Sequence, residues 1–175
     1  MTHHEFILAG TGGQGLILAG ILLAEAAMLD GRNVVQTQSY GIASRGGLSL
    51  AEVIIDDDEI IFQQVRKPDC VLALSEEAAA KYEAWTAKGV TLLYDNALVQ
   101  PRSGANCRGY GFTQAAGDLG RSDSANIVAL GALAAGTGSV SLRSLQRAIE
   151  ARFRAPAREQ NLRLLAIGGD LAASV

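Results

Sequence analysis

The chain has 175 residues, of which 49% are hydrophobic and 19% are charged, and its net charge at pH 7 is −3. This length suits one domain, residues 1–175, with a sizeable buried core, and the composition excludes disordered and fibrous proteins. No basic block is present, which argues against nucleic acid as a partner, and Glu25 interrupts the longest apolar run well short of the roughly 20 residues that cross a membrane.

A glycine-rich turn joins the first predicted strand to the first predicted helix. Glu5–Ala9 is a short apolar strand, and since no charged leader precedes it we expect a cytoplasmic protein. Gly10-Thr11-Gly12-Gly13-Gln14-Gly15 follows, and Leu16–Leu29 then forms the helix. Because glycines lack Cβ atoms, the N–H groups of this turn are able to approach a ligand or a neighbouring chain closely, and the helix adds the positive end of its dipole.

Short apolar runs predict further strands, and capped or periodic runs predict further helices. The strands are expected at Asn33–Gln38, Gly46–Ile55, Glu59–Val65, Cys70–Leu74 and Val90–Tyr94. The helices are expected at Glu76–Lys88 after a Ser75 cap, at Asn126–Ala135, at 142–153 after a Ser141 cap, and at Glu159–Ile167, ended by Gly168-Gly169. Asp56-Asp57-Asp58 is a turn signal, so Glu59–Val65 should pair back on the preceding strand as a hairpin. Pro101–Gly120 should be a loop with one strand near Arg108–Phe112.

The alternation of strands and helices predicts an α/β fold. We expect a three-layer Rossmann-like domain with a mostly parallel sheet and helices on both faces. In such a sheet the loops that follow the strands emerge at one carboxyl edge, where ligands bind.

Gly10-x-Gly12-x-x-Gly15 fits the fingerprint of dinucleotide-binding sites in its letters and in its strand–turn–helix context. That fingerprint also needs a carboxylate after the second strand to hold the ribose hydroxyls, and residues 35–39 contain none. Three interpretations therefore stay open: a bound NAD or FAD, a tight turn without a ligand, and a site that a partner chain completes.

A second motif, Tyr40-Gly41-Ile42-Ala43-Ser44-Arg45-Gly46-Gly47, follows the second strand. It should therefore emerge at the same carboxyl edge as the glycine turn. Arg45 stands next to a glycine pair, where its planar guanidinium is free to meet a carboxylate or a phosphate. The plainer interpretation is a surface turn with a solvated arginine.

The sequence contains no recognisable set of catalytic residues and no metal-ligand set. Its two histidines, His3 and His4, are adjacent and should point to opposite faces of a strand. Its two cysteines, Cys70 and Cys107, lie far apart, so this chain alone cannot hold an iron–sulfur cluster or a structural zinc. Cys70 lies in an apolar run and is expected in the core.

Further motifs accompany these two between Phe6 and Gly169. They are Ala19-Gly20, Gln38-Ser39, Ala51-Glu52-Val53, Lys67-Pro68-Asp69, Asn126, Leu130-Gly131-Ala132, Asn161 and Gly168. Together with the glycine turn and Tyr40–Gly47, they resemble the gamma subunit of the 2-oxoacid:ferredoxin oxidoreductases. That family often has Pro-Glu where this chain has Ile42-Ala43, so any role of the glutamate does not carry over.

The resemblance implies a subunit of a complex that oxidatively decarboxylates a 2-oxoacid and joins the acyl group to coenzyme A. Thiamine diphosphate, Mg²⁺ and [4Fe-4S] clusters are expected in the partner alpha, beta and ferredoxin-like subunits, with none bound by this chain alone. Its spacing favours the 2-oxoglutarate type. The residues expected to face the cofactor centre are Gly10, Gly12, Gly13, Gln14, Gly15, Tyr40, Arg45, Gly46 and Gly47.

Two alternatives remain at the level of sequence. One is an independent NAD(P)-binding dehydrogenase, motivated by the glycine fingerprint. The other is a homodimeric binding module whose contact face is the Ala/Gly-rich helix Asn126–Ala135.

Overall fold

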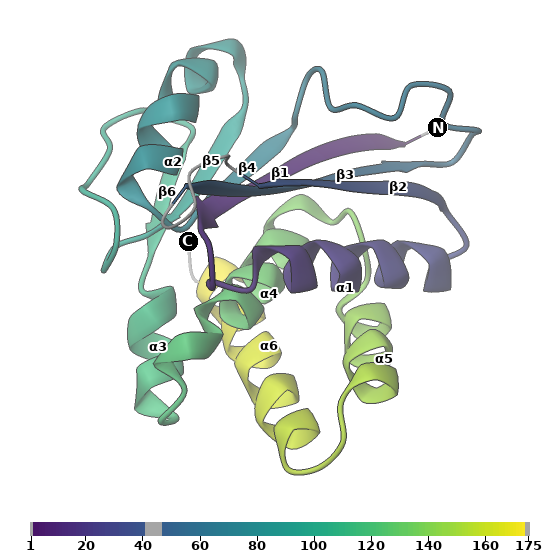
Figure 1. The fold of residues 1–175 in the computed structure, drawn as a ribbon, viewed down its shortest axis with the longest axis vertical. Coiled ribbons are helices and arrows are strands. Elements are labelled where there is room, and N and C mark those ends of the chain that lie inside the picture. The colour runs from purple at the N-terminus through teal and green to yellow at the C-terminus, as the bar shows by residue number, and fades with distance from the viewer. Residues whose placement is uncertain (1, 41–46, 174–175) are drawn as a thin grey trace.

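A six-stranded sheet forms the centre of the protein (Figure 1), and the computed structural model describes residues 2–40 and 47–173. The strands lie in the order β2-β3-β1-β4-β5-β6. β3 pairs antiparallel with β1 and β2, and the other three pairings are parallel, so five of these strands share one direction. The strands are β1 (His3–Thr11), β2 (Asn33–Tyr40), β3 (Leu48–Asp56), β4 (Cys70–Ala73), β5 (Thr91–Asp95) and β6 (Cys107–Tyr110).

Helices cover both faces of the sheet, unequally (Figure 1). The larger layer consists of α1 (Leu16–Leu29), α3 (Phe112–Asp118), the short η2 (Ser122–Ser124), α4 (Ala125–Thr137), α5 (Leu142–Arg152) and α6 (Ala157–Ala173). The smaller layer consists of α2 (Glu76–Tyr82) and the 3₁₀ helix η1 (Glu83–Lys88). The predicted three-layer α/β architecture with a mostly parallel sheet is confirmed.

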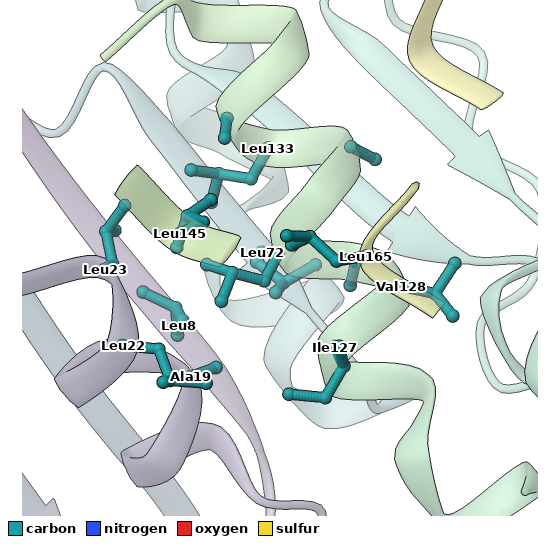
Figure 2. Packing of buried hydrophobic residues seen from close by; sticks show 14 of the residues in the cluster. Leu8, Ala19, Leu22, Leu23, Leu72, Ile127, Val128, Leu133, Leu145 and Leu165 are labelled. Atoms are coloured by element: carbon teal, nitrogen blue, oxygen red, sulfur yellow. The ribbon is translucent and has the colours of Figure 1, made fainter. Parts of the chain in front are cut away.

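Two hydrophobic cores lie between these layers, one on each side of the sheet. Alternate residues of a strand point to opposite faces, so Phe6 and Leu8 enter the core under α1 and α4, whereas Ile7 and Ala9 enter the core under α2. Figure 2 shows the larger core, where leucines of β1, α1, α4, α5 and α6 meet. No helix in the described ranges is long and apolar enough to cross a membrane.

The hairpin predicted for Glu59–Val65 is wrong. This segment is irregular, and the antiparallel hairpin of the fold is instead β2 with β3. The reason lies in the sheet order, because β3 already has β1 on one side and β2 on the other and offers no free edge. The carboxylate of Glu5 holds the end of the segment by accepting the backbone N–H groups of Arg66 and Lys67 at 2.8 and 2.6 Å.

The region predicted as loop after Pro101 contains a helix, α3. Its first turn is bound by the buried carboxylate of Asp95, which accepts the backbone N–H and the hydroxyl of Thr113 at 2.8 and 2.6 Å. The capping oxygen comes from the end of β5, 18 residues away, so no local N-cap signal marks this helix.

The predicted end of the last helix at Gly168-Gly169 is also wrong, since α6 continues to Ala173. These glycines serve helix packing: a Cβ on Gly168 would lie 1.9 Å from the Val128 carbonyl oxygen of α4, and a Cβ on Gly131 would lie 2.2 Å from the Leu165 carbonyl oxygen of α6. The two backbones therefore touch directly. Because α4 is buried continuously from Ala125 to Ala134, it cannot supply the contact face expected for a homodimer.

Gly168→Ala should destabilise the chain by about 3 kcal/mol, because the added methyl forces two closely packed helices apart. Gly136→Ala is the matched control, since a Cβ there meets nothing within 4 Å and alanine should stabilise α4 by about 0.5–1 kcal/mol. Urea denaturation of the two variants measures both effects. Equal stability of the two variants would contradict this account of the α4–α6 contact.

Candidate functional site

The glycine turn leaves β1 at the carboxyl edge of the sheet and enters α1. Gly13 and Gly15 have φ angles of 93° and 71°, a left-handed conformation that other residues adopt only with strain. Gly12 and Gly13 are exposed, and a Cβ at either would meet nothing within 4 Å. The turn therefore presents bare backbone to whatever lies beyond this edge.

The side chain of Gln14 fills the inside of the turn. Its Oε1 accepts the backbone N–H of Thr11 at 2.7 Å, and its Nε2 donates to the carbonyl oxygen of Leu74 at 2.6 Å. A Cβ on Gly10 would lie 2.3 Å from that same Oε1, so this glycine makes room for the amide. Gln14 thereby ties the end of β1 to the residue that follows β4.

Asn126 holds the turn from the helical layer. Its buried amide donates to the carbonyl oxygen of Gly15 at 2.9 Å, and a Cβ on Gly15 would lie 2.4 Å from its Nδ2. The start of α4 and the start of α1 are thus joined by a side chain–backbone contact. Asn126 is one of the motif residues that carry the family resemblance, and its contact with Gly15 gives it a physical role.

The second motif begins and ends at the same edge as the glycine turn. Tyr40 pairs with Ser49 at the end of β2, and Thr11 of the turn pairs with Leu48 at the start of β3. The predicted shared edge is therefore confirmed by the register of β1, β2 and β3. Residues 41–46, which include Arg45 and Gly46, lie outside the described residues, and Gly47 is half-buried just before β3.

A hollow of about 370 Å³ adjoins the turn. It is lined by Gly13, Gln14, Leu74, Leu98, Thr113, Ser122, Asp123 and Ala125. Asp95 supports its wall by accepting hydrogen bonds from Thr113, a role for Asp95 that the sequence alone did not predict. The sequence signal that could have identified this role is a carboxylate at the carboxyl end of a parallel strand.

Among the described residues, no group of three or more His, Cys, Asp or Glu side chains is arranged to hold a metal. The thiol of Cys70 is fully buried, and this burial raises its pKa to about 12, so it is protonated and unreactive. The expected place of Cys70 in the core is confirmed.

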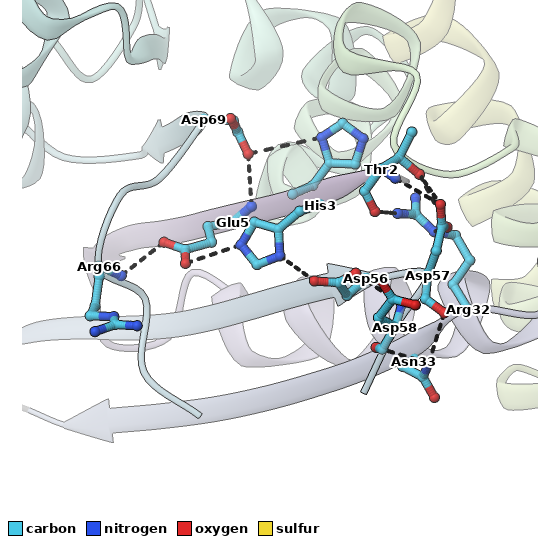
Figure 3. Close-up of polar contacts among 11 residues, drawn as sticks. Thr2, His3, Glu5, Arg32, Asn33, Asp56, Asp57, Asp58, Arg66 and Asp69 are labelled. Carbon is cyan, nitrogen blue, oxygen red and sulfur yellow. Dashed lines mark hydrogen bonds and ion pairs between the residues drawn. The ribbon is translucent and has the colours of Figure 1, made fainter. Parts of the chain in front are cut away.

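The histidines lie at the opposite edge of the sheet, in the polar network of Figure 3. His3 Nδ1 is 2.5 Å from the Asp56 carboxylate and its Nε2 is 3.2 Å from Glu5, and the hydrogen bond to Asp56 raises the pKa of His3. Arg32 joins the same network through Asp57 at 2.9 Å. This cluster fastens the beginning of β1 to the end of β3 and has no part in the carboxyl edge.

Comparison with known proteins gives a consistent picture. A family model described as pyruvate ferredoxin/flavodoxin oxidoreductase matches residues 5–171. The chain is 41% identical over 169 residues to the 2-oxoglutarate synthase subunit KorC of Archaeoglobus fulgidus, which covers 96% of this chain and 87% of the relative. The KorC subunit of Methanocaldococcus jannaschii is 40% identical over 174 residues, covering 96% and 93% respectively.

A solved structure agrees with this result. The gamma subunit of a keto/oxoacid ferredoxin oxidoreductase from Geobacter sulfurreducens PCA superposes with a TM-score of 0.87. It is 40% identical in sequence and covers 99% of this chain and 98% of its own.

Gln14→Glu should destabilise the chain by about 2 kcal/mol at pH 7. A carboxylate can still accept the Thr11 N–H, but it cannot donate to Leu74, and one of its oxygens would face the Leu74 carbonyl oxygen. Gln63→Glu is the control, since Gln63 is exposed in an irregular segment and the same change there should shift stability by less than about 0.5 kcal/mol. Urea denaturation compares the two variants. An equal response at both positions would contradict the bracing role of Gln14.

Proposed function

Because the chain belongs to the pyruvate ferredoxin/flavodoxin oxidoreductase family, we propose that it is the gamma subunit of a 2-oxoglutarate:ferredoxin oxidoreductase complex. The gamma-subunit resemblance inferred from its motifs is confirmed by these relatives. The observation that carries the choice of 2-oxoacid is the identity of about 40%, over nearly the whole chain, to subunits named for 2-oxoglutarate synthase. The alternative of an independent NAD(P) dehydrogenase finds no support among them.

The carboxyl edge is the part of the subunit that would face the catalytic centre. Gly12 supports this assignment, because neither its φ angle nor any neighbour within 4 Å requires a glycine for the chain's own folding. A residue without a side chain at an exposed turn allows another chain to approach the backbone closely. In this proposal that chain is the thiamine-binding partner, and Arg45 of the second motif would offer its guanidinium to a carboxylate or a phosphate.

The cofactors of the reaction belong to the other subunits. Thiamine diphosphate with Mg²⁺ would stabilise the carbanion formed by decarboxylation, and [4Fe-4S] clusters would carry two electrons to ferredoxin. A [4Fe-4S] cluster needs four thiolates, and this chain has two cysteines, one of them buried. The chain's contribution is therefore a wall around the centre where 2-oxoglutarate and coenzyme A meet, with alpha, beta and ferredoxin-like subunits as partners.

Co-expression with the partner subunits tests the proposal. We expect the chain to co-purify with them in a complex that reduces a viologen dye with 2-oxoglutarate and coenzyme A. Its kcat/KM for 2-oxoglutarate should exceed those for pyruvate and 2-oxoisovalerate by at least roughly tenfold, since a site built for a second carboxylate leaves a buried charge unpaired with smaller substrates. Failure to associate would overturn the subunit role, whereas a preference for another 2-oxoacid would overturn only the substrate.

Gly12→Val should leave the isolated chain folded with its stability changed by less than about 1 kcal/mol, because the new side chain meets open space. In the complex it should weaken assembly or lower turnover by at least roughly tenfold, because it blocks a close approach. Gly136→Val is the control, since that position is equally open but lies ten residues farther along α4 than Asn126, the residue that contacts the glycine turn. Full assembly and turnover of Gly12→Val would contradict the assignment of this edge.

A further inference from the structure

The connection between β3 and β4 is irregular, and side chains near the start of β1 fasten it to the sheet. We call residues 58–67 of this connection the strap. The strap forms neither a helix nor a strand, so no ladder of backbone hydrogen bonds holds it in place. It carries two exposed hydrophobic side chains, Ile61 and Phe62, which are 81% and 63% exposed. Its attachment therefore depends on a small number of contacts between side chains and the backbone.

Two carboxylates make contacts of this kind, one at each end of the strap. Oδ1 of Asp56 accepts the backbone N–H of Asp58 at 2.9 Å, at the beginning. Oε2 of Glu5 accepts the backbone N–H groups of Arg66 and Lys67 at 2.8 and 2.6 Å, at the end. Each carboxylate thus binds the strap with one oxygen, and its second oxygen is available to another partner.

The partner of both second oxygens is His3. Figure 3 shows the imidazole ring between the two carboxylates, with Nδ1 2.5 Å from Oδ2 of Asp56 and Nε2 3.2 Å from Oε1 of Glu5. An ionised carboxylate can only accept hydrogen bonds, and a neutral imidazole has a single N–H. Only the imidazolium form of His3, which has an N–H on each nitrogen, can therefore donate to both carboxylates at once.

Glu5 is the carboxylate that depends more on the charge of His3. Its side chain is only 10% exposed, and His3 is its one cationic partner among the ion pairs of the described residues. A buried carboxylate is costly unless it is paired and hydrogen-bonded. When His3 loses a proton, its remaining N–H stays with the closer Asp56, and the lone pair of Nε2 then faces Glu5. Glu5 in that state favours water, which weakens its hydrogen bonds to Arg66 and Lys67.

Protons reach His3 directly from the solvent. Its side chain is 51% exposed and lines a hollow of about 260 Å³ formed by β1, β3 and the strap. The charged groups around this hollow are Glu5 on β1, Asp56 on β3, and Glu59 and Arg66 on the strap. The hydrogen bond to Asp56 raises the pKa of His3 above its usual value, and Glu5 acts in the same direction.

From this arrangement we propose that the protonation state of His3 controls the attachment of the strap. The imidazolium bridges Asp56 and Glu5 and keeps the end of the strap on the sheet, whereas the neutral ring releases that end. Because the Arg66 guanidinium lies 4.0 Å from the centre of the Phe62 ring, release also disturbs the surroundings of Phe62. Since the folded chain raises the pKa of His3, attachment is complete below the ordinary histidine pKa of about 6.5 and is lost as the pH rises through the raised pKa.

Backbone hydrogen exchange of the full chain, resolved by NMR and corrected for intrinsic exchange rates, tests the proposal at pH values of about 6 and about 9. The protection factors of the Arg66 and Lys67 amides should fall by at least roughly threefold at the higher pH, as expected when a partly exposed ion pair is lost. The Asp58 amide should respond less, because Asp56 keeps its hydrogen bond to the neutral ring. Burial lowers the pKa of His4, so that residue titrates below this range.

His3→Gln removes the titrating group, and His4→Gln is the matched control. Glutamine carries no charge, so in His3→Gln the protection of Arg66 and Lys67 should be as low near pH 6 as it is in the wild type near pH 9. His4 lies next to His3 on the opposite face of β1, and its replacement should preserve the pH response. Both variants should keep the circular dichroism spectrum of the wild type, since neither side chain belongs to the hydrophobic core.

The titration of the His3 ring, followed by its carbon chemical shifts in the same samples, must have the same midpoint as the response of the strap. Equal protection of Arg66 and Lys67 at both pH values in the wild type would overturn the proposal. A pH response that persists in His3→Gln, that disappears in His4→Gln, or that has a different midpoint from the ring would also overturn it. None of these outcomes depends on whether the chain assembles with other subunits.

Discussion

The amide of Gln14 is the contact on which the carboxyl edge depends. It accepts from Thr11 and donates to the carbonyl after β4, so it fixes the end of β1 against the neighbouring parallel strand while the chain reverses into α1. Gly10 leaves space for the amide, and Gly15 leaves space for Asn126 of α4. The conformation of the turn is therefore fixed by the side-chain amides of Gln14 and Asn126, which lie inside the fold. The backbone of Gly12 and Gly13 faces outward. In dinucleotide-binding proteins a turn with the same glycine pattern has a different function, because there the glycines allow the backbone to approach a pyrophosphate.

The glycines of this chain fall into groups with separate physical causes. Gly13 and Gly15 are explained by their positive φ angles, and Gly131 and Gly168 are explained by the backbone contact between α4 and α6. Gly12 belongs to neither group, because its conformation and its surroundings would tolerate a side chain. A residue that the chain's own folding leaves unexplained directs attention to a neighbour. Gly12 is therefore the position in this turn where we expect a neighbouring chain to approach the backbone.

The sequence predicts elements well where the signal is local. The bounds of α1 agree with the structure, and Ser75 and Ser141 cap α2 and α5 as expected. It fails where a distant residue decides the outcome. The carboxylate of Asp95, at the end of β5, caps the first turn of α3. Both sides of β3 are already paired, with β1 and β2, so Glu59–Val65 cannot pair with it. Gly168-Gly169 resembles a helix end because a glycine pair usually has that meaning, yet here tertiary packing overrides propensity. For the site, the sequence identifies both motifs and their common edge, but not that the amide of Gln14 is engaged on both sides within the fold.

Helix α1 is hydrophobic almost all round, with Glu25 as its one charged residue. Periodicity alone cannot separate the inner and outer rows of such a helix, because both rows are hydrophobic. The sheet register separates them, since Gly20 faces Ala51 of β3. The row formed by Ile17, Ile21, Ala24 and Met28 then lies toward β2, which is an edge strand within the described residues.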